Sequence, residues 1–299
     1  MADGGQLRNI YEDNEHYNKA FLLYDKLGDR IGTMERWCKS GFTTDIMPKL
    51  KVKISEEQPL RTLGVGSGSG ELESHILKQL LQKFPRIDNH VVEPSAELSG
   101  KYKEYVSANT ADLKGIDYHW EQLLLEEYQQ KREKDGDTSK FHFISAVHSL
   151  YYFNDLGKWL DYLYGLLDEG GLLVVMLTSD TSGLGNIMRE FPKLGSKSNF
   201  GFSDVDISHV RRHFDDAGIA HCDSLIPIRV EMTDCFADNP SPEADLLIDF
   251  AAHCIDFRKN SDDQLGDRFL KFLGSDKCTE KRDDGRRYFR GDWGVTVVQ

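Results

Sequence analysis

The chain has 299 residues, of which 39% are hydrophobic and 11% aromatic, and its formal net charge is −13. Such a sequence can bury one large core, but it has no apolar run long enough for a transmembrane helix, and its excess of acids argues against nucleic acid as a partner. We therefore expect a cytosolic enzyme that acts on a small molecule. We also expect it to be a monomer.

Strands and helices alternate along the chain, which is typical of a doubly wound parallel α/β sheet. A helical segment over residues 17–49 comes first. The expected strands that follow cover 61–65, 89–93, 116–120, 141–147 and 171–178. The expected helices between them cover 72–84, 96–108, 123–132 and 155–167. We interpret Asp168-Glu169-Gly170-Gly171 as a helix end that leads into the fifth strand.

The last third of the chain changes character. A helix over 203–217, with Ser203 as N-cap and Gly218 after its end, leads to a strand over 221–230. A final strand covers 287–298, and a largely helical insertion over 234–283 separates these two strands. Seven strands are thus expected in one sheet.

A glycine-rich turn and an acid after the next strand form the most informative pattern. The first strand runs into Gly66-x-Gly68-x-Gly70, where missing side chains let backbone amides approach a ligand. The second strand ends at Glu93, where a carboxylate can accept both ribose hydroxyls. The glycine spacing differs from that of pyrophosphate sites, and Glu71 would suit a sulfonium rather than a phosphate. The pair predicts an S-adenosylmethionine pocket; a purely structural turn is the alternative.

Several short motifs resemble those of the histamine N-methyltransferase family. In chain order they are Val91-Val92-Glu93-Pro94-Ser95-Ala96-Glu97, Lys101-Tyr102-Lys103-Glu104, Leu150-Tyr151-Tyr152, Asp234-Cys235-Phe236 and Asp245-Leu246-Leu247-x-Asp249-Phe250. The resemblance runs from about Tyr17 to the C-terminus. It implies a class I methyltransferase with a Rossmann-like seven-stranded sheet, which uses S-adenosylmethionine to methylate a ring nitrogen of a small imidazole compound.

We expect one methyltransferase domain over 1–299. Within it, residues 1–55 would form a helical substrate cap, 56–233 the cofactor-binding core, 234–285 a helical insertion on the substrate side and 286–299 the final strand. The cap and the insertion would enclose a cavity suited to a metabolite.

On the cofactor side, the resemblance places Gly66 at the cofactor glycine, Glu93 at the ribose-binding acid and Val147 at a contact on the fourth strand. Leu98 and Leu125 stand where the family usually has Gln and Ser, so backbone groups would have to replace those polar contacts. The remaining residues of the predicted cofactor site are Gly68, Gly70, Pro94 and Ser95.

On the substrate side, the resemblance places His148, Tyr151 and Tyr152 in an aromatic and polar cluster after the fourth strand, with His148 replacing a glutamine. Phe250 matches an aromatic pocket position. We expect His148 to hydrogen-bond the second nitrogen of the substrate ring, or to accept a proton, and the tyrosines to flank the ring. Structural packing is the alternative for the tyrosines.

Two positions depart from the family. Its substrate-binding glutamate aligns on Arg30, and its asparagine near the C-terminus aligns on Gly291. A guanidinium reverses the sign of the site and can grip a carboxylate, which favours histidine or an imidazole dipeptide over histamine. Alternatively, a one-residue shift places Asp29 at the site and restores amine binding, or Arg30 faces solvent. Another small amine or heterocycle as substrate, and a catalytically silent member of the family, are further hypotheses.

Five widely spaced cysteines form no C-x-x-C pair: Cys38, Cys222, Cys235, Cys254 and Cys278. We expect them to be reduced and mostly buried. His142 alternates with phenylalanines on an expected strand and is interpreted as structural, and Trp37 and Trp293 as cavity lining or core. The sequence indicates no metal site and no hydrolase triad.

Overall fold

The computed structural model describes residues 7–55, 57–192, 194 and 205–299, and it divides into two compact units. The first, which we call the sheet unit, comprises Ile31–Leu177, Ile207–Ser224 and Val295–Gln299. The second, which we call the insertion unit, comprises Met1–Arg30, Thr178–Asp206 and Leu225–Gly294. The expected cap over 1–55 is therefore shared between the units. That both units act as one domain stays a prediction.

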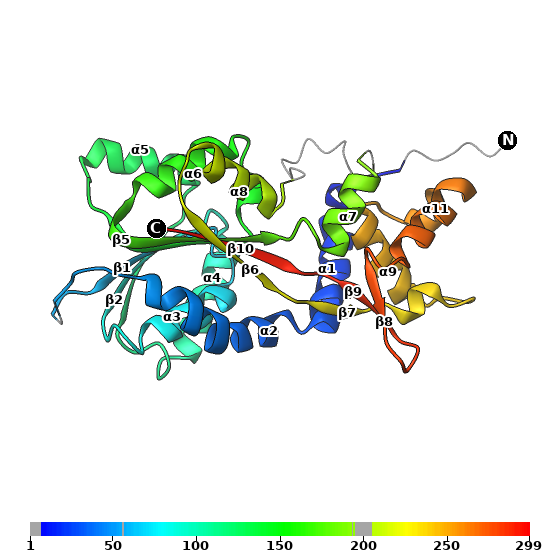
Figure 1. The fold of residues 1–299 in the computed structure, drawn as a ribbon, viewed down its shortest axis with the longest axis horizontal. Helices are drawn as coiled ribbons and strands as arrows, with labels where there is room; N and C mark the ends of the chain where they lie inside the picture. Colours follow the sequence, from blue (N-terminus) through cyan, green and yellow to red (C-terminus); the bar gives the residue numbers. More distant parts are fainter. Residues whose placement is uncertain (1–6, 56, 193, 195–204) are drawn as a thin grey trace. The chain divides into compact units, whose positions relative to one another are not determined.

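Seven strands form one sheet in the order β3-β2-β1-β4-β5-β10-β6 (Figure 1). Their bounds are β1 Leu60–Val65, β2 Ile87–Val92, β3 Ile116–Glu121, β4 Phe141–Val147, β5 Leu167–Thr178, β6 His221–Ile226 and β10 Trp293–Val298. Neighbours among β1 to β5 are parallel. Strands β4 and β10 are buried almost throughout, as expected where helices cover both faces. The predicted Rossmann-like sheet is confirmed.

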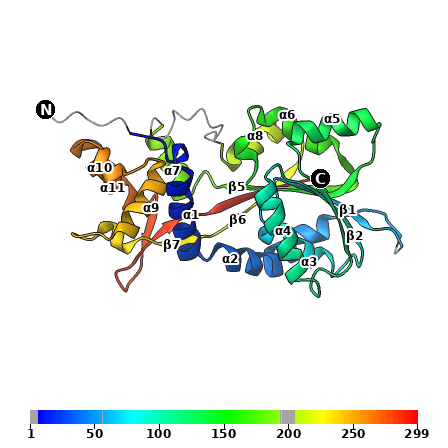
Figure 2. The same ribbon diagram turned by 180° about the vertical axis from the view of Figure 1, so that it is seen from behind.

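The helices of the sheet unit cover both faces of the sheet: α3 and α4 lie on one face, and α5, α6 and α8 on the other (Figures 1 and 2). Their bounds are α3 Glu71–Leu80, α4 Ala96–Ala108, α5 Leu125–Asp135, α6 Leu156–Gly165 and α8 Ile207–Asp216. Before them come α2 Arg30–Trp37, the π-helix η2 Cys38–Ile46 and the 3-10 turn η3 Met47–Lys49; the turn η4 Leu150–Tyr152 follows β4. Helix α4 begins where predicted because the Ser95 hydroxyl caps the Leu98 amide.

The insertion unit contains a second, antiparallel sheet in the order β7-β9-β8. Its strands are β7 Arg229–Glu231, β8 Thr279–Lys281 and β9 Arg287–Arg290. Its helices and turns are η1 Ile10–Glu12, α1 Asn14–Gly28, α7 Gly183–Glu190, η5 Thr233–Phe236, α9 Pro242–Ala252, α10 Phe257–Asn260 and α11 Asp263–Leu273. Helix α1 packs on α9 and β7. The predicted helical insertion over 234–285 therefore also contributes a strand, β8.

Two expected strands are each divided in the structure. The strand expected over 221–230 becomes β6 and β7, because Pro227 has no N–H to donate between them. The final strand expected over 286–299 becomes β9 and β10, which are interrupted at Gly291 and Asp292. The interruptions face each other, since the Gly291 amide donates to the Ile228 carbonyl (3.0 Å). The single final strand was therefore a wrong prediction.

Two predicted helix ends also differ. Helix α6 ends at Gly165, and Asp168–Gly170 already belong to β5, where the register with β4 shifts between Phe141 and Phe143. Gly170, with φ of 75°, permits this irregularity. Helix α8 begins at Ile207, and the predicted N-cap Ser203 lies outside the described residues.

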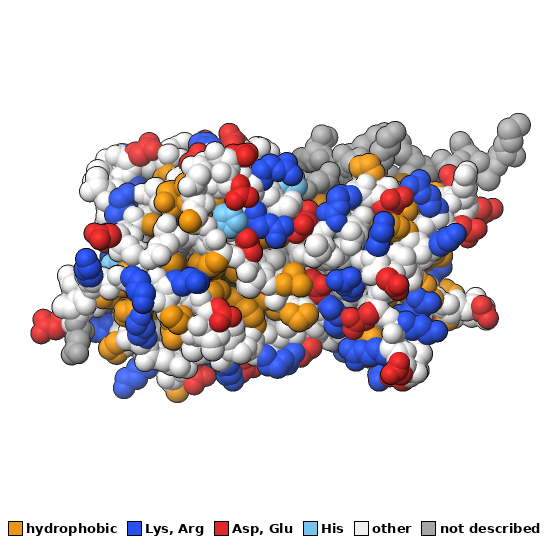
Figure 3. All heavy atoms as spheres, in the orientation of Figure 1, with side chains coloured by type: hydrophobic (Ala, Val, Ile, Leu, Met, Phe, Trp, Pro, Cys, Tyr) orange, Lys and Arg blue, Asp and Glu red, His pale blue; other side chains and the backbone are white. Residues whose placement is uncertain are grey.

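Three further features concern hydrophobic helices, cysteines and surface charge among the described residues. No described helix combines the length and apolar character needed to cross a membrane. All five cysteines are free; Cys222 is half-buried and the others are buried. On the face drawn in Figure 3, acidic and basic side chains are interspersed.

Candidate active site

The loop after β1 depends on glycine at two positions. Gly66 and Gly70 have φ of 62° and 74°, a conformation that side chains rarely adopt. A Cβ at Gly66 would lie 2.4 Å from the Ser149 Cβ, and one at Gly70 would lie 2.0 Å from the Tyr102 ring. The Gly66 amide donates to the Val92 carbonyl at 2.8 Å, which ties the loop to the end of β2. The loop is thus fixed by close packing as well as by its backbone conformation.

Glu93, at the end of β2, binds the middle of this loop through its side chain. Its carboxylate accepts from the Gly68 amide (2.8 Å) and from the Ser95 amide (2.9 Å), and the residue is 6% exposed. A Cβ at Gly68 would have no atom within 4 Å, so there is space beside the carboxylate. Pro94, which follows Glu93, is exposed. An acid oriented by backbone amides at the end of a second parallel strand is suited to bind ribose hydroxyls.

A second acid, Glu73, lies beneath the loop, and sequence reasoning did not single it out. Its carboxylate is buried, accepts from the Asn89 side chain at 3.2 Å, and occupies the space that a Cβ at Gly64 would need. Burial raises the pKa of Glu73 to about 7, and contacts with Ser67 and Asn89 oppose that rise only in part. Glu71, which the sequence had indicated, is the first residue of α3 and is half-buried.

His148 follows β4 directly and has φ of 53°, an uncommon conformation for a residue with a side chain. Its amide continues the sheet by donating to the Met176 carbonyl at 2.8 Å. Its Nδ1 lies 3.0 Å from the Tyr151 hydroxyl, and the two rings stack at a centroid distance of 6.1 Å. Tyr151 is buried, whereas Tyr152 is 58% exposed. The chain therefore holds an imidazole and two phenols at the carboxyl end of β4.

Three other predicted cofactor residues, Val147, Leu98 and Leu125, have apolar side chains that are half-buried or buried. Val147 and Leu98 are half-buried, and the Leu98 amide is already bound by the Ser95 hydroxyl. Leu125 opens α5 with its side chain buried. At these positions the structure offers apolar surface rather than hydrogen-bonding side chains.

In the insertion unit, the predicted substrate residues Arg30 and Phe250 belong to one cluster. We call it the Arg30 cluster: Phe21, Tyr24, Asp25, Arg30, Phe250, Gly291 and Trp293. The Arg30 guanidinium lies 5.0 Å from the ring centroids of both Phe21 and Trp293, and its Nη1 donates to Asp25 at 2.9 Å. Phe250 packs on Tyr24, with a centroid distance of 4.5 Å.

Gly291, another predicted substrate residue, belongs to the cluster through its contact with Tyr24. A Cβ at Gly291 would lie 2.1 Å from the Tyr24 hydroxyl oxygen. Tyr24 is buried, which raises the pKa of its hydroxyl to about 12 and keeps it neutral. Tyr24 thus occupies the space into which an asparagine at position 291 would extend. No sequence pattern had linked these two residues.

Arg30 and Asp29 differ in their surroundings. The Arg30 side chain is 11% exposed and is held by the two rings and Asp25. Asp29 ends α1 in the left-handed conformation (φ 44°) and is exposed. Arg30 therefore lies in the cluster rather than in solvent, and which of the two residues meets a substrate stays a prediction.

The structure therefore brings the predicted site residues into two groups. Gly66, Gly68, Gly70, Glu93 and Ser95 form the glycine loop and its acid, and His148 and Tyr151 lie in the same unit, on the loop after β4. Arg30, Phe250 and Gly291 form the other group, within the insertion unit. The joint action of the two groups on one substrate stays a prediction.

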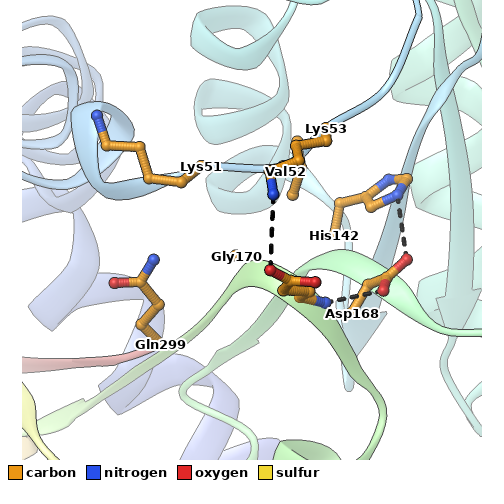
Figure 4. A pocket seen from close by; sticks show the side chains of 8 residues that line it. Lys51, Val52, Lys53, His142, Asp168, Gly170 and Gln299 are labelled. Atoms are coloured by element: carbon orange, nitrogen blue, oxygen red, sulfur yellow. Dashed lines mark hydrogen bonds and ion pairs between the residues drawn. The ribbon is translucent and has the colours of Figure 1, made fainter.

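A cavity of about 430 Å³ lies elsewhere in the sheet unit, at the amino ends of β4 and β5 (Figure 4). Figure 4 shows His142 pointing toward Asp168, with 3.7 Å between Nε2 and the carboxylate. The His142 Nδ1 accepts from the Arg61 amide at 2.8 Å, and burial lowers the pKa of His142. These bonds agree with a structural role for His142, and the glycine loop lies at the opposite end of the strands.

Comparison with known proteins gives the class of this fold and site. A family profile described as a methyltransferase domain matches residues 41–221, more than half of the chain, so the protein belongs to this family. It is an enzyme that uses S-adenosylmethionine, as the glycine loop and Glu93 predicted.

Similar curated proteins include the histamine N-methyltransferases of Danio rerio (28% identical) and Rattus norvegicus (29%), and histamine N-methyltransferase A of Xenopus laevis (26%), each over 98% of both chains. The resemblance predicted from short motifs is confirmed over nearly the whole length. Among solved structures, the plantazolicin methyltransferase BpumL in complex with a pentazolic desmethylPZN analog and SAH gives a TM-score of 0.49 at 10% identity, over 97% of this chain and 92% of that chain.

Proposed function

We propose that the protein methylates a ring nitrogen of a small imidazole compound that carries a carboxylate, such as histidine or an imidazole dipeptide. The observation that supports this most is the Arg30 guanidinium, held between Phe21 and Trp293 at a position where the related family has a glutamate. A planar guanidinium presents five donors and fits a carboxylate in two parallel hydrogen bonds. The imidazole part of the proposal comes from the relatives, whose name specifies histamine.

The main requirement for methyl transfer is that the protein align the substrate nitrogen with the methyl donor. S-adenosylmethionine supplies a methyl group on a sulfonium, which is already activated. The lone pair of a neutral imidazole nitrogen forms the new N–C bond while the C–S bond breaks and its electron pair stays on sulfur. The methylated ring, now cationic, passes the proton of its other nitrogen to the acceptor that faces it or to water. Alignment and exclusion of water, which the aromatic side chains of the proposed site provide, are then the main catalytic contributions.

We assign His148 to the alignment of the substrate ring. In the tautomer whose Nδ1 donates to the Tyr151 hydroxyl, Nε2 is an acceptor. A neutral imidazole substrate has one N–H that requires such an acceptor while its other nitrogen reacts. Tyr151 and Tyr152 offer ring faces for the flat substrate and for the positive charge that develops on it.

Histamine itself is the second candidate, and Asp25 favours it. The Asp25 carboxylate is 27% exposed and accepts from Arg30 at 2.9 Å. The ammonium of histamine would be attracted to the same carboxylate if Arg30 turned away from it. Arg30 and Asp25 carry opposite charges. A carboxylated imidazole would bind to Arg30, whereas histamine would bind to Asp25.

Replacement of Arg30 separates these candidates. Arg30→Gln should lower the ratio of kcat/KM for histidine to kcat/KM for histamine by about 10–100-fold, because a charge-assisted pair is lost. Arg30→Lys keeps the positive charge but not the planar guanidinium, so its ratio should lie between those of Arg30→Gln and the wild type. Initial rates with labelled S-adenosylmethionine would measure both ratios.

A matched control is Arg268→Gln. Arg268 also pairs with a carboxylate, Glu190, and lies over an aromatic ring, Phe191, but it is on α11 and outside the Arg30 cluster. Its replacement should leave the substrate ratio unchanged. An unchanged ratio in both Arg30 variants would instead remove the carboxylate from the proposal. Activity only on heterocyclic amines without imidazole would overturn the proposed substrate class.

We further propose a cytosolic monomer with a small-molecule substrate and no nucleic-acid partner. The net charge of −13 and the five free cysteines support this. Light scattering coupled to size exclusion would test the monomer, and a mass of twice the chain would contradict it.

A further inference from the structure

Three metal-ligating side chains meet on one face of the sheet, although the sequence had indicated no metal site. They are Asp88 and His90 on β2 and His119 on β3, and their ligand atoms all lie within 4.8 Å of one another. Asp88 and His90 are two residues apart and so share a face of their strand. The parallel register places His119 directly beside His90. In the sequence the two histidines are distant, which is why spacing did not reveal them.

The distances are close to those that one metal ion requires. His119 Nε2 lies 2.7 Å from Asp88 Oδ1, and His90 Nε2 lies 3.6 Å from the same oxygen. Metal–ligand bonds of about 2.0–2.2 Å at tetrahedral angles place two ligand atoms about 3.3 Å apart. The two imidazole rings stack at a centroid distance of 4.6 Å, with both Nε2 atoms near Oδ1. Small ring rotations would therefore complete the geometry.

A second observation concerns Oδ1 of Asp88. This oxygen is buried, and among the described residues no donor reaches it in hydrogen-bond geometry. The other carboxylate oxygen, Oδ2, is 3.6 Å from Arg61 Nε. Arg61 therefore faces one oxygen of Asp88, and the other oxygen contacts the two imidazoles without accepting a hydrogen bond in good geometry.

We propose that Asp88, His90 and His119 bind a divalent transition-metal ion, for which zinc is the probe of choice. Two imidazoles and a carboxylate suit borderline ions such as Zn²⁺ rather than Mg²⁺ or Ca²⁺. His119 is 53% exposed, so the ion can enter and can hold water at its fourth position. The Arg61 charge opposes the ion, and the affinity is accordingly weaker than in closed four-ligand zinc sites. The bound ion joins the edge strand β3 to β2.

Zinc titration of metal-free, tag-free protein tests this site. Calorimetry should show one equivalent of bound Zn²⁺, and His119→Ala and Asp88→Asn should each weaken it about tenfold or more. His213→Ala is the matched control, because His213 also lies 2.7 Å from an aspartate, Asp161, but belongs to no group of three potential ligands among the described residues. That variant should bind zinc as the wild type does.

Melting temperature and the Co²⁺ absorption spectrum provide two further tests of the metal site. Zinc should raise the melting temperature of the wild type but not that of His119→Ala, and His119→Gln serves if the alanine variant is unstable. Co²⁺ should give an absorption spectrum without the intense band of thiolate ligands. Equal zinc affinity in the wild type and the His119 variants, no binding at all, or a thiolate band would each overturn the proposal.

Discussion

The glycine loop and the Arg30 cluster obey different constraints. In the loop, the backbone determines the geometry: Gly66 and Gly70 have positive φ and are packed against Ser149 and Tyr102. In the Arg30 cluster, side chains determine it: the Arg30 guanidinium lies over two aromatic rings and pairs with Asp25. Under the proposed function, the cofactor site built from backbone has been kept, whereas the substrate site built from side chains has reversed its charge without altering the fold.

The largest effect is expected for Gly70→Ala. The new methyl group would clash with the Tyr102 ring, and alanine would have to adopt a φ of 74°. We therefore expect the unfolding free energy to fall by about 3 kcal/mol or more and cofactor binding to be lost. Gly136→Ala is the matched control, with φ of 64° and no atom within 4 Å, and should cost about 1 kcal/mol. Urea unfolding and calorimetry with S-adenosylmethionine would measure both. Equal losses in the two variants would show that packing under the loop is unimportant.

The next effect concerns Glu73 and pH. Its pKa is about 7 in the folded protein, so native Glu73 keeps its proton at pH values where the unfolded chain has lost it. The unfolding free energy should therefore fall as pH rises from about 4.5 to about 7, by about 3 kcal/mol in total, and stay lowered above that range.

Glu73→Gln should remove this contribution to the pH dependence and be more stable than the wild type at pH 8 by about 2 kcal/mol. Glu71→Gln, in the same turn but half-buried, is the control. Urea unfolding at several pH values would measure the difference. Parallel pH curves for the wild type and Glu73→Gln would rule out an ionisable group beneath the loop.

A smaller effect, of about 1–2 kcal/mol, is expected for Gly291→Ala in the Arg30 cluster. The added methyl group would press on the Tyr24 hydroxyl, and Tyr24→Phe should relieve part of that cost. The double variant should accordingly be more stable than the sum of the single changes predicts. Additive effects in denaturant unfolding would mean that Tyr24 does not occupy the space of residue 291.

The sequence was sufficient to predict the sheet, most of its helices and the glycine loop with Glu93. These features depend on local signals: alternating apolar strands, a Ser95 cap and glycines where a side chain cannot fit. The division of the last strands was missed, because it depends on Ile228, which follows Pro227, lying opposite Gly291. Tyr24 beside Gly291, Glu73 beneath the loop and His119 beside His90 were missed for the same reason. The first and the third are contacts between residues distant in the chain, and Glu73 is held beneath the loop by Asn89 of the next strand.

The most direct test of the central claim, that the substrate site has reversed its charge, is wild-type turnover of labelled S-adenosylmethionine. Histamine, histidine, carnosine and heterocyclic amines without imidazole would be compared, and the methylated nitrogen would be identified by NMR. We predict that kcat/KM is highest for the carboxylated imidazoles, with methylation on the ring. A preference for histamine would contradict the claim and would mean that the cluster still binds an ammonium, through Asp25.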